Sequence, residues 1–134
     1  MSEHDLVMEW LEIALEDVES AEYLLGKPHR KPLEIICYHC QQSAEKSLKG
    51  YLQARGEEIP ITHNIRLLCS RCIELEIAFE SHMAACAALT LYAVRTRYPN
   101  RIELEEQDAV RAIRWAKEIY ELAVKLCAAL EQNK

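Results

Sequence analysis

The chain has 134 residues, of which 50% are apolar and 28% are charged, a composition that fits one globular domain and excludes a disordered chain. Its formal net charge of −6 disfavours a protein that coats duplex nucleic acid by bulk positive charge, although a local basic patch is compatible with it. Three glycines and four prolines are too few for a turn-rich β-sandwich or β-barrel.

The sequence also bears on location. It has no apolar run of the roughly 18–20 residues that a membrane span needs. The N-terminus, MSEHDLVMEW, lacks the basic start and apolar middle of a signal peptide. We therefore expect no membrane association and a cytoplasmic location, in which the six cysteines are free thiols, core residues or metal ligands rather than disulfides.

Apolar residues recur at three- and four-residue steps along most of the chain, which predicts helices. The expected helices cover Asp5–Leu25, Leu33–Gln53, a segment that begins at an N-cap on Thr62, Phe79–Thr96 and Glu105–Leu130. Because the joints between them are short, neighbouring helices should be antiparallel. The sequence thus predicts an all-α, up-and-down antiparallel helix bundle of four to five helices, in a single domain over residues 1–134.

Two helical faces carry further expectations. The inner face of the first helix is expected to hold Leu6, Trp10, Ile13, Ala14, Ala21, Leu24 and Leu25. The second and fourth helices are apolar on more than one side, since Leu89 and Tyr92 lie away from the stripe that contains Phe79 and Met83. Such an excess favours contact with a second copy of the chain, or a central helix that is surrounded within one chain.

Two C-x-x-C pairs, Cys37–Cys40 and Cys69–Cys72, have the spacing of zinc ligands. Both pairs lie inside helical runs rather than tight turns. In an antiparallel hairpin Cys40 and Cys72 would lie about 22 Å and about 14 Å from the turn, at different heights. We therefore interpret the pairs as small core residues and expect no metal and no cofactor, with a zinc-stabilised bundle or a redox pair as the alternatives.

Acidic residues on apolar faces raise a different question. Asp17 falls between Ala14 and Ala21, and Glu45 has a similar position on the second helix. A buried carboxylate needs a cation, so Asp17 and Glu45 are candidates for structural ion pairs, with Arg95 or Arg97 as partners. The alternatives are that Asp17 reaches water, and that the arginines bind phosphate while Tyr98 stacks on a base.

Several blocks, in order along the chain, resemble the HEPN domain family, the higher-eukaryote and prokaryote nucleotide-binding domains. The blocks run from Trp10 to Leu25, from Cys37 to Lys49, from Ile61 to Ile65 and from Thr96 to Pro99. The resemblance implies an all-α bundle that forms a homodimer and, in prokaryotes, is often encoded with a minimal nucleotidyltransferase as a toxin–antitoxin pair.

Some members of the family are metal-independent ribonucleases with an arginine followed four to six residues later by a histidine. Here the last histidine is His82, before Arg95 and Arg97, so the usual acid–base partner is missing. We therefore expect a non-catalytic module, a homodimer that binds a nucleotide, RNA or a nucleotidyltransferase partner. The expected contact residues are Lys46, Lys49, Arg95, Arg97 and Tyr98. The alternative is a ribonuclease toxin with a rearranged active site that uses His63 or His39.

Overall fold

The computed structural model describes residues 1–95 and 103–134, apart from the side chains of residues 93–95. Its elements are α1 (Glu3–Leu25), α2 (Leu33–Ala54), α3 (Ile65–Leu75), the 3-10 helix η1 (Ile77–His82), α4 (Met83–Arg95) and α5 (Glu106–Gln132). The described residues contain no strand. The all-α helix bundle that the periodicity predicts is therefore confirmed.

The helix ends differ from the expected ones where local hydrogen bonds decide them. Ser2 and Asp5 form a reciprocal capping box at the start of α1, two residues before the predicted start. The N-cap of α3 is Asn64, whose side chain accepts a hydrogen bond from Leu67 N, so the expected cap on Thr62 is wrong. Phe79, the expected start of the fourth helix, lies instead in η1, and α4 begins at Met83.

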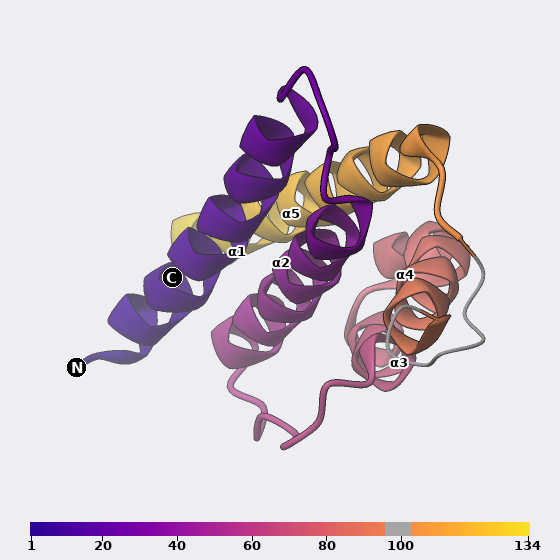
Figure 1. The fold of residues 1–134 in the computed structure, drawn as a ribbon. Helices are drawn as coiled ribbons and strands as arrows, with labels where there is room; N and C mark the ends of the chain where they lie inside the picture. Colours follow the sequence, from indigo (N-terminus) through magenta and orange to yellow (C-terminus); the bar gives the residue numbers. More distant parts are fainter. Residues whose placement is uncertain (96–102) are drawn as a thin grey trace.

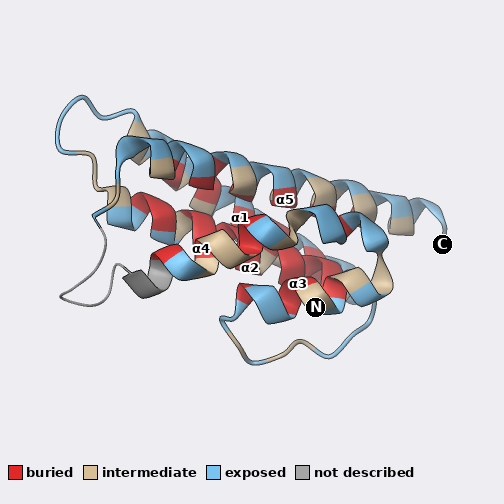
Figure 2. Cartoon of the chain, turned by 90° about the vertical axis from the view of Figure 1, so that its right-hand side faces the viewer, coloured by how far each residue is buried: buried red, intermediate tan, exposed pale blue. Residues whose placement is uncertain are grey.

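Helix α2 lies at the centre of the bundle, in contact with α1, α3, α4 and α5 (Figure 1). Its buried residues therefore lie all round the helix, and the outer faces of α1 and α5 are exposed (Figure 2). Leu89 and Tyr92 of α4 are also buried within the chain, with 0% and 9% exposure. Leu89 and Tyr92 are thus used inside one chain, and these two residues give no support to a dimer contact.

The inner face of α1 is rotated from the predicted one. The buried residues are Val7, Leu11, Ala14, Val18 and Ala21, whereas Ile13 is 37% exposed. Both sets have helical spacing, so periodicity alone does not choose between them. The observed face packs closely against α2, where a Cβ atom on Gly50 would lie only 3.1 Å from Leu11 Cδ2.

The joint between α2 and α3 does not form a simple hairpin. Gly56, with a φ of 73°, turns the chain at the end of α2. The joint then runs back along α2 until His63 reaches Glu45, and α3 follows α2 in the same general direction, so that Cys72 contacts Leu48 and Leu75 contacts Arg55. This return path places His63 beside the middle of the central helix.

No helix in the described part of the chain is long and apolar enough to cross a membrane.

Candidate functional site

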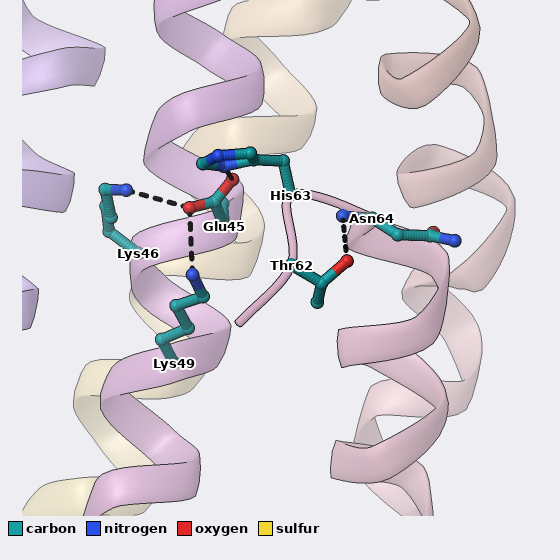
Figure 3. Close-up of polar contacts among 6 residues, drawn as sticks. All are labelled: Glu45, Lys46, Lys49, Thr62, His63 and Asn64. Atoms are coloured by element: carbon teal, nitrogen blue, oxygen red, sulfur yellow. Dashed lines mark hydrogen bonds and ion pairs between the residues drawn. The ribbon is translucent and has the colours of Figure 1, made fainter. Parts of the chain in front are cut away.

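A buried carboxylate with three cationic or imidazole partners lies in the middle of α2. Glu45 is 0% exposed. Its Oε2 atom accepts hydrogen bonds from Lys46 Nζ at 2.8 Å and from Lys49 Nζ at 3.2 Å. Its Oε1 atom lies 2.9 Å from His63 Nδ1 (Figure 3). We call Glu45, Lys46, Lys49 and His63 the Glu45 cluster.

Local sequence explains how the cluster is assembled. Glu45 and Lys49 are one helical turn apart and therefore lie on the same side of α2. His63 comes from the joint before α3, where Thr62 Oγ1 accepts a hydrogen bond from Asn64 N at 3.0 Å. Asn64 then caps α3. These two short contacts fix the backbone on both sides of His63 and direct its ring to Glu45 (Figure 3).

The carboxyl group of Glu45 is ionised in this setting. Burial by itself would raise its pKa. The hydrogen bonds from Lys46 and His63, together with the charges of both lysines, outweigh burial and hold the pKa of Glu45 below its ordinary value of 4.5. An ionised carboxylate only accepts hydrogen bonds, so His63 Nδ1 carries the proton and donates it. Nε2 of His63 is then the ring nitrogen left for another partner.

The cluster carries excess positive charge. Two ammonium groups share one carboxylate, so the net charge of the Glu45 cluster is positive even when the His63 imidazole is neutral. The groups differ greatly in accessibility, because the His63 side chain is 81% exposed, that of Lys46 is 18% exposed and that of Lys49 is 9% exposed. An incoming anion would therefore meet His63 and Lys46 first, while Lys49 mainly holds Glu45.

Trp10 of α1 closes the other side of the cluster. Its ring centroid lies 5.9 Å from Lys46 Nζ and 5.7 Å from Lys49 Nζ, distances at which a cation interacts with an aromatic ring. Trp10 Nε1 donates to Gln53 Oε1 at 3.4 Å. Trp10 was expected in the inner face of α1; it is only partly buried and lies beside the polar side chains Lys46, Lys49 and Gln53 of α2.

The second expected carboxylate, Asp17, has a histidine as its described partner. Asp17 Oδ1 lies 2.9 Å from Nδ1 of His39 on α2, and both side chains are partly exposed. The described contacts of Asp17 and Glu45 thus involve histidines and lysines. Arg97 and Tyr98 lie outside the described residues, as does the side chain of Arg95, so the structure does not place the three expected residues relative to the Glu45 cluster.

The four cysteines of the C-x-x-C pairs belong to the hydrophobic core and are free thiols. Cys72 Sγ contacts Leu48 O at 3.7 Å. Leu48 is eight residues beyond Cys40 on α2, about 12 Å along the helix, too far for one zinc ion to bind both cysteines. Burial raises the pKa of Cys37 to about 12 and raises that of Cys40 further. Among the described residues, no group of three or more histidine, cysteine or acidic side chains could hold a metal.

The fold and site define an all-α bundle whose central helix anchors a partly buried basic cluster. Two solved structures are similar to it. A crystal structure of ST0689, an archaeal HEPN homologue, has a TM-score of 0.71 and 26% identity, and the match covers 90% of this chain and 97% of that one. A crystal structure of TT1696 from Thermus thermophilus has a TM-score of 0.72 and 26% identity, with 89% and 96% covered. A comparison with curated proteins gives no match.

The HEPN domain family matches residues 7–127, which is most of the chain. The chain therefore belongs to the HEPN domain family, as the sequence blocks indicated. The matched range includes all members of the Glu45 cluster.

Proposed function

We propose that this chain is a non-catalytic HEPN module, one domain over residues 1–134, that binds the phosphate groups of a nucleotide or RNA. The observation that carries the proposal is the net positive charge of the Glu45 cluster, with His63 exposed at its edge. Hydrogen-bond donors that belong to a positively charged cluster and remain accessible to solvent favour the binding of phosphate. In this proposal Lys46 and His63 contact the anion, Lys49 positions Glu45, and Arg95, Arg97 and Tyr98 supply further charge and a stacking surface.

The expected setting follows from the family. The module would act as a homodimer together with a minimal nucleotidyltransferase, in an arrangement of the toxin–antitoxin type. Membership of the family supports this proposal, and the absence of a histidine after Arg95 and Arg97 in the sequence supports a binding role rather than cleavage.

Titration of the purified protein with ATP and with a short fluorescent RNA tests the binding. We expect a dissociation constant that is roughly micromolar at low salt and rises steadily as salt is added. Arg97→Ala and His63→Gln should each weaken binding about tenfold, the cost of one hydrogen bond to a charged group. Arg71→Ala on the exposed side of α3 is the matched control and should bind as the wild type does. Absence of any binding at all salt concentrations contradicts the proposal.

A second function is favoured by one feature of the site. Glu45 orients His63 through Nδ1 and leaves Nε2 accessible, which is how a carboxylate prepares an imidazole for general acid–base work. A ribonuclease with a rearranged active site could use this pair, and the Asp17–His39 pair has a similar form.

An RNase assay in excess chelator separates the two functions. Binding without cleavage supports the module. Cleavage that disappears in His63→Gln but persists in His82→Gln would favour the ribonuclease instead. Cleavage that persists in both variants and in His39→Gln would indicate a contaminating nuclease.

A further inference from the structure

An apolar groove lies between the N-terminal half of α1 and the C-terminal half of α5. It encloses about 540 Å³ and is lined by Met8, Leu11, Leu15, Tyr120, Val124 and Cys127, with side chains at the end of α2 completing it. Met8 is 43% exposed and Leu15 is 36% exposed. The two helices are antiparallel here, because His4 pairs with Glu131 at one end and Glu22 pairs with Lys117 at the other.

The groove has a strongly acidic border. Glu3, Glu12 and Glu131 lie at its rim, and the rim residues Lys134 and His4 both contact Glu131. Among the described residues, the Glu12 side chain forms no ion pair or hydrogen bond. The whole of α1 carries eight acidic residues and no lysine or arginine. An apolar strip therefore runs beside a row of carboxylates that have few cations to neutralise them.

We propose that this groove binds a basic amphipathic helix of a partner protein. The lining on α1 extends from Glu3 to Leu15, about 18 Å, which matches about three turns of a docked helix. Such a helix would place apolar residues at three- and four-residue steps in the groove, and its lysines and arginines against Glu12 and the neighbouring carboxylates.

Charge excludes the obvious competitors for the groove. A second copy related by a two-fold axis would bring the acidic face of one α1 against the same face of the other. A nucleic acid would bring phosphates to a negative rim. The groove is also separate from the Glu45 cluster, because Met8, which lines the groove, and Trp10, which lies against Lys46 and Lys49, point about 160° apart around α1. The inference therefore does not depend on the proposed anion binding.

Fluorescence anisotropy with synthetic peptides tests the inference. The probes are three helical peptides of about sixteen residues with leucine, isoleucine or phenylalanine on the apolar face and lysine on the other, together with a counterpart of each in which glutamate replaces lysine. We expect at least one basic peptide to bind, no acidic counterpart to bind comparably, and the affinity to fall as salt is added.

Matched variants locate the site. Met8→Lys removes an anchor contact and adds repulsion, so it should weaken binding about tenfold. Glu12→Lys at the rim should weaken binding about fivefold, whereas Glu9→Lys, the same charge change on α1 outside the lining, should have little effect. Circular dichroism should show all three variants folded.

Four outcomes would overturn the inference. They are equal binding of basic and acidic peptides, no binding by any basic peptide, an equal effect of Glu12→Lys and Glu9→Lys, and a dimer of the wild type that Met8→Lys converts to a monomer. The last outcome would assign the groove to a second copy.

Discussion

At the scale of single residues, Glu45 is the carboxylate at the centre of the bundle that two lysines and a histidine surround. It is fully buried and, among the described residues, is the only anionic partner of Lys49, whose side chain is itself 9% exposed. Removal of the carboxylate charge would leave two ammonium groups beside an uncharged amide. The free-energy cost of leaving buried charges without a partner is several times the stabilisation that an exposed ion pair provides.

Glu45→Gln should therefore lower the free energy of unfolding by about 3 kcal/mol at pH 7. Urea unfolding followed by circular dichroism measures the change. Glu57→Gln, the same substitution at an exposed position of the joint, should change stability by less than about 0.5 kcal/mol. Equal effects of the two substitutions would show that the Glu45 cluster contributes nothing particular to stability.

The same residue predicts a pH dependence. The pKa of Glu45 is lowered in the folded protein and returns toward 4.5 on unfolding, so its stabilising contribution is complete above about pH 5. That contribution is lost as the pH falls through the lower pKa of the folded state. The difference in unfolding free energy between the wild type and Glu45→Gln should thus shrink as the pH is lowered from about 5 to about 3. A difference that stays constant over this range would contradict the ionised, paired state.

The cysteines allow a further test at this scale. Burial raises the pKa of Cys37 to about 12 and that of Cys127 to about 11, and the thiolate is the reactive form. At about pH 8 a disulfide reagent should modify the native protein at least about a hundredfold more slowly than the urea-unfolded protein, in which all six thiols react. Fast labelling of several thiols in the native protein would show that the pairs are accessible rather than packed in the core.

At the scale of elements, the crossing of α1 and α2 depends on Gly50. A Cβ atom there would lie 3.1 Å from Leu11 Cδ2 and 3.2 Å from Trp10 Cβ, and the latter atom is attached directly to the backbone of α1. Alanine is the better helix former, but the neighbouring helix would have to move to admit the methyl group. The close approach of the two helices also keeps Trp10 beside Lys46 and Lys49.

Gly50→Ala should therefore lower the unfolding free energy by about 1–2 kcal/mol despite the gain in helix propensity. Gly26→Ala is the matched control, because a Cβ atom there meets only ordinary contacts and the φ of −72° suits alanine. It should leave stability unchanged or slightly raised. Thermal unfolding of both variants measures the difference, and a more stable Gly50→Ala protein would show that α1 and α2 have room to separate.

At the scale of the whole molecule, the proposed homodimer needs a surface that the bundle itself does not bury. Leu89 and Tyr92 do not provide it, since both are buried within the chain. Exposed apolar side chains remain near the start of α2, where Ile35 is 52% exposed and Tyr38 is 44% exposed. The groove between α1 and α5 is too acidic to meet its own copy.

Sedimentation equilibrium should accordingly give a mass of about twice the 15.5 kDa of the chain. Ile35→Lys combined with Tyr38→Lys should shift the protein toward a monomer, because buried charges at an interface are costly. Ile61→Lys, a change on a fully exposed apolar residue of the joint, should not alter the mass. A monomer at all concentrations would contradict the proposed assembly.

Local information in the chain was enough to establish the helical class of this protein, the ends of α1, α2 and α5 to within about two residues, and the family to which the chain belongs. Periodicity, caps and ordered sequence blocks each act over a few residues, so they can be recognised without knowing how the helices pack. The same kind of information singled out Glu45 as a carboxylate in need of a cation.

The packing of the helices in three dimensions determined which polar side chains contact each other. The return path of the joint carries His63 back to Glu45, eighteen residues earlier in the chain, and the pairing of α1 with α2 brings His39 to Asp17. The rotation of α1 that buries Val7 and exposes Ile13 has the same origin. Such pairings depend on how helices cross and where a joint runs, and neither is encoded in the spacing of residues along one helix.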